Sequence, residues 1–164
     1  MMYWFTASFR WSSKFKKVDL NEILERTLAD YELLIKEKST KVVKNNLPTI
    51  KAIPQQMEQL FANLISNCLK YSSTTTTPVI TISSMINDDN TITLSFSDNG
   101  IGFDEKYSKQ IFKLFQRLHG KNEYSGTGIG LSICEKIAEQ HGGSISANSI
   151  LGKGATFNII LPLK

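Results

Sequence analysis

The spacing of apolar residues changes several times along this chain, and these changes constrain its fold more than any other feature. Apolar residues recur at helical spacing in three segments, 20–35, 54–71 and 129–140. Apolar and polar residues alternate in 79–86 and 91–97, which is typical of strands with one buried face. Helices and strand pairs that follow one another in this way predict two packed layers around one core.

The other predicted elements are short, and one helix start is well defined. Asp19 can cap the first helix, and Glu22 stands three residues later, as a capping box requires. We expect this helix to end near Lys38, since cations favour helix C-termini. Short strands are predicted around 42–43 and 50–53, a short helix at 108–115, and final strands at 144–149 and 155–161.

The length and composition indicate one folded domain. The chain has 164 residues, of which 41% are hydrophobic and 21% charged, so it can bury a core without disulfides or metals. We assign residues 15–164 to this domain. Residues 1–14 fit no clear element and are either the stub of a helix from an upstream domain or a remnant of cloning.

Charge and cysteine content narrow the class of protein. The net charge is +4, and lysines dominate it, which predicts a solvated surface. We expect no nucleic-acid binding, because the one basic cluster, Lys14, Lys16 and Lys17, has no recognition motif beside it.

Cys68 and Cys134 lie in apolar helical patterns, which predicts reduced thiols in a cytoplasmic protein. No apolar run approaches the roughly 18 residues that span a bilayer, so we expect no membrane contact from this domain, even if its parent is membrane-anchored.

A polar stripe runs along the predicted helix 54–71. At roughly 100° per residue, its members fall on one face of an ideal helix: Gln56, Gln59, Asn63, Asn67 and Lys70. Amide oxygens of this kind can complete the coordination of a Mg²⁺ ion that already carries phosphates. A lysine one turn away can meet phosphate charge directly. Taken alone, however, a solvated polar face is the more common explanation of such a stripe.

Two glycine-rich segments follow. Segment 98–102, Asp-Asn-Gly-Ile-Gly, comes directly after an apolar strand, where Asp98 can accept a hydrogen bond from an exocyclic amine such as that of adenine. Its glycines allow the backbone to approach a flat ring, although the same residues also make a simple turn. Segment 126–131, Gly-Thr-Gly-Ile-Gly-Leu, opens a helix, whose N-terminal N–H groups can bind an anion. It does not match the Walker pattern, and by itself it is weak evidence of a phosphate-binding site.

Together, the order and spacing of these segments resemble the catalytic domain of sensor histidine kinases, in the GHKL superfamily shared with type II topoisomerases, heat-shock chaperones and mismatch-repair ATPases. The matching motifs are the N box at 63–71, the G1 box at 98–102, the F box at 112–117, the G2 box at 126–131 and a last glycine motif at 152–156. The F box between G1 and G2 favours the kinases over the other branches. The resemblance implies an α/β (α+β) two-layer sandwich with a mixed β-sheet on about three helices, the Bergerat-type ATP-binding fold.

The resemblance implies ATP and Mg²⁺ as cofactors. Asn67 would be the main magnesium ligand, with Asn63 assisting. Lys70 and Tyr71 would contact phosphates, and Arg117 would be a further phosphate contact. Asn67, Lys70 and Arg117 form the implied catalytic set.

The implied adenine pocket lies in the G1 box and the last glycine motif. Asp98 would read the adenine amine. Gly100, Ile101 and Gly102 would border the ring. Thr156 would reach the adenine side, directly or through water.

A mobile lid is implied around the phosphate tail. Its nucleotide-binding residues are Gly126, Thr127, Gly128, Gly130 and Leu131. The three glycines would hold the phosphates and hinge the lid. Phe112 and Phe115 would anchor the lid and could meet the partner domain.

The phosphoacceptor itself is not expected in this chain. The two histidines, His119 and His141, do not lie in the helical segment that the family uses. The implied reaction is therefore transfer of the ATP γ-phosphate to a histidine on a separate dimerisation domain, with a response regulator downstream. Cys68 stands where alanine is common and Ala155 where a hydroxyl residue often sits, and neither departure should abolish nucleotide binding.

Two other functions stay open at this point. A GHKL-type serine kinase acting in trans shares the N, G1 and G2 boxes, but it usually lacks this F box. A degenerate, non-catalytic nucleotide-binding module would signal by contact, although intact Asn67, Asp98 and G2 glycines argue against degeneracy.

Overall fold

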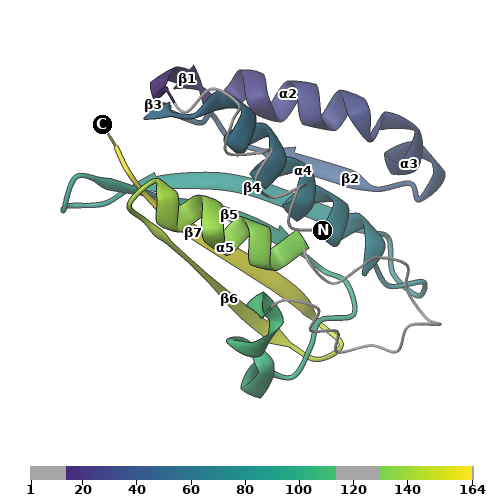
Figure 1. Cartoon of the computed structure of the whole chain (residues 1–164). Helices are drawn as coiled ribbons and strands as arrows, with labels where there is room; N and C mark the ends of the chain where they lie inside the picture. Colours follow the sequence, from purple (N-terminus) through teal and green to yellow (C-terminus); the bar gives the residue numbers. More distant parts are fainter. Residues whose placement is uncertain (1–13, 114–129, 164) are drawn as a thin grey trace, which may run out of the picture.

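The computed structural model describes residues 14–113 and 130–163, which form two layers (Figure 1). A five-stranded sheet makes one layer; α4 and α5 cover one of its faces, and α2 packs beside α4. The elements are β1 (Lys16–Asp19), α2 (Leu20–Asp30), α3 (Glu32–Glu37), β2 (Lys41–Lys44), β3 (Thr49–Ala52), α4 (Pro54–Lys70), β4 (Val79–Ile86), β5 (Thr91–Asp98), η1 (Glu105–Tyr107), η2 (Gln110–Phe112), α5 (Gly130–Gln140), β6 (Ser144–Ile150) and β7 (Gly154–Pro162). Among the described helices, none combines the length and hydropathy that crossing a bilayer requires.

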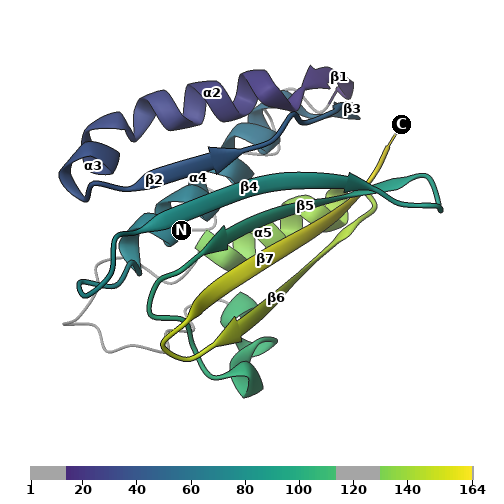
Figure 2. The same ribbon diagram turned by 180° about the vertical axis from the view of Figure 1, so that it is seen from behind.

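The sheet is mixed, as expected. Its strand order is β2-β4-β5-β7-β6, with β2 parallel to β4 and the other neighbours antiparallel. Figure 2 shows the face of this sheet that the helices leave open. Along β5, alternate residues Ile92, Leu94 and Phe96 are buried under the helices, whereas Thr93 and Ser95 between them are half-buried. The two-layer prediction is therefore confirmed.

Helix α4 is the centre of the core. Its buried residues are Met57, Leu60, Phe61, Leu64, Ile65, Cys68 and Leu69. Phe61 packs edge-on against Phe96 of β5, with ring centroids 5.1 Å apart and an interplanar angle of 80°. Burying one such side chain contributes about 1.5–3 kcal/mol. This contact fixes the rotation of α4 on the sheet and so decides where its polar stripe points.

The structure corrects three details of the prediction. The first helix divides at Tyr31, whose φ of −103° and ψ of 13° interrupt the helix before α3 begins. The described part of the helix predicted at 108–115 contains only the short 3₁₀ turn η2, which follows the 3₁₀ turn η1, and the last two predicted positions lie outside the described residues. Strand β1 was not predicted, because its four residues gain strand geometry only by pairing with β3 in a separate two-stranded sheet.

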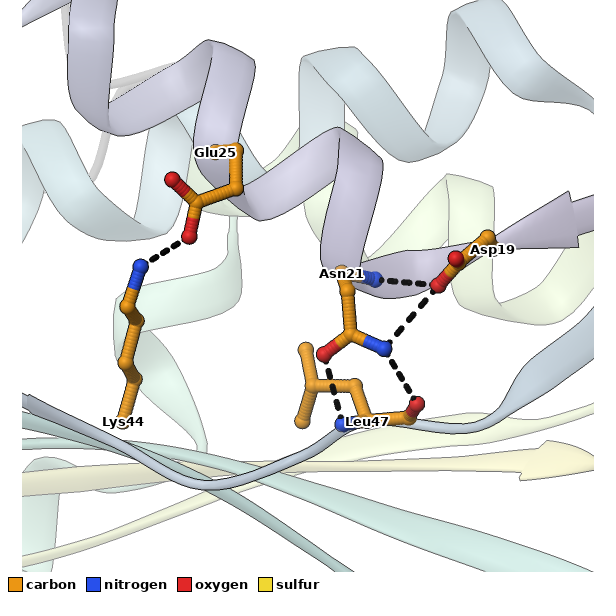
Figure 3. A network of polar contacts seen from close by, with 5 residues as sticks. All are labelled: Asp19, Asn21, Glu25, Lys44 and Leu47. Atoms are coloured by element: carbon orange, nitrogen blue, oxygen red, sulfur yellow. Dashed lines mark hydrogen bonds and ion pairs between the residues drawn. The ribbon is translucent and has the colours of Figure 1, made fainter.

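Asn21 ties the start of α2 to the segment before β3 (Figure 3). Its side-chain amide donates to the carbonyl of Leu47 at 2.7 Å, and its side-chain oxygen accepts the Leu47 N–H at 2.8 Å. Asp19 accepts from the Asn21 backbone N–H at 2.9 Å, which confirms the predicted cap. Lys44 and Glu25 form an ion pair beside this network. The network satisfies backbone groups that no strand ladder reaches.

His141 joins the end of α5 to the start of α4. Its Nε2 accepts the N–H of Ile53 at 3.1 Å, and its Nδ1 lies 2.8 Å from the carbonyl oxygen of Ile137. Because Nε2 accepts, the ring is neutral and Nδ1 carries the proton. Burial lowers the pKa of His141, and the bond to the Ile137 carbonyl opposes this effect. A buried histidine with both ring nitrogens engaged in this way holds α5 and α4 together.

We expect the free energy of unfolding to fall as the pH is lowered from about 6.5, because the unfolded chain then protonates His141 more readily than the folded chain does. The decrease in the free energy of unfolding should level off below the pKa that His141 has in the folded state. Urea unfolding near pH 7.5 and near pH 5.5 measures it. His141→Gln should lower stability at the higher pH and reduce the difference between the two pH values. An unchanged difference in this variant would contradict the assignment.

Candidate nucleotide-binding site

Four predicted motifs, far apart in sequence, meet where α4, β5, α5 and the β6–β7 turn converge. The carbonyl of Tyr71, at the end of α4, accepts the N–H of Ile101 at 3.0 Å. The side-chain amide of Asn63 donates to the carbonyl of Gly130, the first residue of α5, at 3.1 Å. The Ile101 carbonyl accepts the N–H of Gly152 at 2.7 Å. These bonds bring the N box, the G1 box, the end of the G2 box and the last glycine motif together.

The two asparagines of the N box have different surroundings. Asn63 is engaged twice, since its Oδ1 also accepts from Gln59 at 3.0 Å. Asn67 is half-buried, and no described residue forms a hydrogen bond with its side chain. The Asn67 carboxamide therefore offers an oxygen to a ligand, whereas Asn63 also links α4 to α5.

Lys70 and Tyr71 close the N box. Lys70 is the last residue of α4 and is half-buried. Tyr71 is the C-cap, and its N–H donates to the Asn67 carbonyl at 3.1 Å. Lys38 reinforces this helix end from α3, because its Nζ donates to the Leu69 carbonyl at 2.7 Å. The position of both predicted phosphate contacts thus depends on how α4 ends.

Asp98 lies at the end of β5 on the helix-covered face, in alternation with Phe96. One carboxylate oxygen accepts the N–H of Gly100 at 2.8 Å. Burial raises the pKa of the Asp98 carboxyl, and the Gly100 N–H partly offsets that rise. Cys68, buried nearby on α4, has its thiol pKa raised by burial and then by the charge of Asp98. Hydrogen bonds from the Cys68 thiol and the Ala155 backbone also lower the pKa of this carboxyl. Because a carboxylate has about four acceptor sites, it can still accept a hydrogen bond from an exocyclic amine.

Glycine is required at two places in the G1 box. A Cβ at Gly100 would lie 2.3 Å from the Tyr71 carbonyl oxygen. Gly102 has a φ of +62°, and a Cβ there would lie 2.4 Å from the carbonyl oxygen of Ile150. The loop between Asp98 and Gly102 therefore runs in close backbone contact with both the N box and the β6–β7 hairpin.

Thr156 is placed away from the other predicted site residues. It pairs with Ser97 across β5 and β7, and their hydroxyl oxygens are 2.5 Å apart. Because side chains alternate along a strand, both lie on the face opposite to Asp98. The residue directly across from Asp98 is Ala155. The alternation of Ala155, Phe157 and Ile159 in the sequence already contained this information.

The F box and G2 box are described only in part. Phe112 is buried and packs edge-on against Phe157 of β7, with ring centroids 6.3 Å apart. This contact anchors η2 to the sheet, and the roles of Phe112 at the lid and at the partner domain stay predictions. Leu131 is half-buried on α5 and packs against the core. The predicted residues Phe115, Arg117, Gly126, Thr127 and Gly128 lie outside the described residues.

Sequence reasoning missed several side chains that shape this site. Asn99 was interpreted as a turn residue, yet its side chain accepts the Val79 N–H at 2.8 Å and donates to the Thr77 carbonyl at 3.0 Å. It therefore holds the threonine-rich segment 72–78, which leads into β4, beside the G1 box. Ser149 is a buried serine on β6. The sequence feature that could have revealed it is its position: Ser149 continues the inward-facing series Ile145 and Ala147, where a serine is unusual.

Comparison with known proteins defines the class. The model of a family described as "Histidine kinase-, DNA gyrase B-, and HSP90-like ATPase" matches residues 52–164. This range contains the N box, the G1 box and the last glycine motif that the structure brings together. The chain therefore belongs to this family of ATP-binding domains.

Two curated relatives show which members of this family the chain is similar to. Cyanobacterial phytochrome A of Nostoc sp. (strain PCC 7120) is 41% identical over 149 residues, which cover 91% of this chain and 19% of the relative. The adaptive-response sensory kinase SasA of Synechococcus elongatus is 34% identical over 144 residues, covering 88% of this chain and 35% of the relative. The chain thus spans about a fifth to a third of the length of these curated relatives.

A solved structure shares both the fold and the extent of this chain. The catalytic domain of the histidine kinase ThkA superposes with a TM-score of 0.77 at 25% identity, covering 92% of this chain and 98% of that one. The predicted kind of domain is therefore confirmed: this is the ATP-binding catalytic domain of a sensor histidine kinase.

Gly100→Ala should destabilise the domain, because its methyl group would overlap the Tyr71 carbonyl and separate the G1 loop from α4. Overpacking of this kind typically costs about 1–3 kcal/mol. Gly130→Ala is the matched control, since a Cβ there would lie 3.9 Å from the nearest Asn63 atom. Urea unfolding of both variants tests the difference. Equal stability of Gly100→Ala and the wild type would show that the loop does not depend on this contact.

Proposed function

We propose that this domain binds Mg²⁺–ATP between α4, the G1 loop and the start of α5. The observation that carries the proposal is the convergence of an available Asn67 carboxamide, a half-buried Asp98 carboxylate and the Gly100 backbone at one end of the sheet. Asp98 would accept a hydrogen bond from the adenine amine. Gly100, Ile101 and Gly102 would border the ring, and Lys70 with Tyr71 would face the phosphates.

The donor set suits magnesium. Mg²⁺ prefers oxygen ligands and keeps several waters when phosphates supply the others. Asn67 offers a neutral amide oxygen without a described partner, and Asn63 has one acceptor site left after its bond to Gln59. We assign Asn67 as the main ligand and Asn63 as an assisting one. Bound there, the ion would neutralise charge on the phosphates.

The proposed reaction is phosphoryl transfer to a histidine of another domain of the parent protein. A neutral imidazole nitrogen attacks the γ-phosphorus, the bond from that phosphorus to the β–γ bridging oxygen breaks, and ADP leaves. The phosphoimidazole loses its ring proton to solvent. The catalytic domain contributes positioning and charge stabilisation. Lys70 and Arg117 are the proposed cationic contacts to the phosphates.

The partners follow from this reaction. A dimerisation domain would present the phosphoacceptor histidine, and a response regulator would receive the phosphoryl group from it. ATP is the cytoplasmic phosphoryl donor, so we place the domain in the cytoplasm. Lys14, Lys16 and Lys17 form the sole basic cluster noted in the sequence, and they support no nucleic-acid partner.

Calorimetric titration with Mg²⁺–ATP tests the site. We expect Asp98→Asn to weaken binding about tenfold or more, because an amide cannot provide the same charged acceptor. Asn67→Asp should weaken it similarly by placing a negative charge beside the triphosphate. Asp89→Asn, in the turn between β4 and β5, and Asn46→Asp, in an exposed loop, are the matched controls. Wild-type affinity in both site variants would refute the site.

Incubation with γ-labelled ATP tests the reaction. The domain alone should bind nucleotide without labelling itself, and it should label the parent's phosphoacceptor domain when that domain is added. The product should be acid-labile, as phosphohistidine is. An acid-stable product would instead indicate a serine kinase. Binding without transfer to the added domain would indicate a non-catalytic module.

A further inference from the structure

Ser149 connects the two glycine motifs that surround the proposed purine pocket. It is buried, with 7% of its surface exposed, at the end of β6. Its Oγ accepts the N–H of Phe103, directly after the G1 box, at 2.8 Å. The same hydroxyl donates to the carbonyl of Gly154 at 2.8 Å. One side chain thus satisfies a donor of the G1 loop and an acceptor of the last glycine motif.

Glu105 holds this serine from the other side. Its carboxylate accepts the backbone N–H of Ser149 at 2.6 Å. Glu105 begins η1, which follows the G1 box directly, so this bond closes a ring of contacts between 103–105 and the β6–β7 hairpin. A charged acceptor makes this hydrogen bond stronger than one between neutral groups.

The hairpin held in this way lies against Asp98. A Cβ at Gly154 would be 2.0 Å from the Asp98 carbonyl oxygen, which shows how closely the two backbones approach. A Cβ at Gly102 would be 3.0 Å from the Ser149 hydroxyl. A shift of Ser149 is therefore transmitted by direct contact to both ends of the G1 loop.

We propose that Ser149 and Glu105 are positioning residues for purine recognition, which hold Asp98 and the G1 loop in register with the base. The proposal rests on the proposed nucleotide site. Neither residue touches the nucleotide; each acts through the loop that does. Their loss should therefore reduce the preference for a 6-amino purine more than it reduces the affinity for the phosphate tail.

The test compares the affinity for ATP with that for purine riboside triphosphate, which lacks the 6-amino group. The wild type should prefer ATP, and in Ser149→Ala this preference should fall by about threefold to tenfold, since one hydrogen bond is at stake. Ser149→Thr keeps the hydroxyl and should restore the preference. Ser146→Ala, exposed on the same strand, is the matched control and should behave as the wild type.

Glu105→Ala provides a second variant, because Glu105 is exposed and its loss should not unfold the domain. We expect the same fall in the preference for ATP over purine riboside triphosphate. Glu105→Gln keeps an acceptor oxygen and should recover most of this preference. Unchanged ratios in Ser149→Ala and Glu105→Ala would overturn the proposal, as would an equal fall in Ser146→Ala. If the wild type itself binds neither nucleotide, the proposed function fails rather than the positioning role.

Discussion

This site depends on the contact between the Tyr71 carbonyl and the G1 loop. The carbonyl ends α4, accepts the N–H of Ile101, and lies so close to Gly100 that no side chain fits between them. A helix C-terminus leaves its last carbonyls without partners inside the helix. In this domain the loop after β5 supplies one partner, and Lys38 supplies another at Leu69. The N box and the G1 box are thereby fixed to each other through backbone atoms.

The core explains why this contact occurs where it does. Phe61 packs on Phe96, so α4 and β5 cannot rotate independently. Two residues after Phe96 comes Asp98, and six residues after Phe61 comes Asn67. The apolar periodicity that forms the core therefore also places the polar residues of the site. Function is built at the end of the same helix and strand whose middle parts supply the stability.

The structure gives some predicted site residues a second role or a different place. Asn63 links α4 to Gly130 while keeping one acceptor site. Phe112 is buried against Phe157 rather than turned outward. Thr156 bonds to Ser97 on the face of the sheet that the helices leave open. In each case the sequence supplied the residue type, and the tertiary structure set the direction of its side chain.

The sequence by itself determined the layers, the helix α4 with its polar stripe, and the order of the motifs, because hydrophobic periodicity and turn residues are local signals. It also determined the kind of domain, since the N, G1, F and G2 boxes occur in one order. Only the tertiary structure decided the pairing of β1 with β3, the place of Thr156, and the bonds that Ser149 and Glu105 make with residues up to 46 positions away. Such contacts depend on which segments meet in space, and no local pattern of residues specifies that.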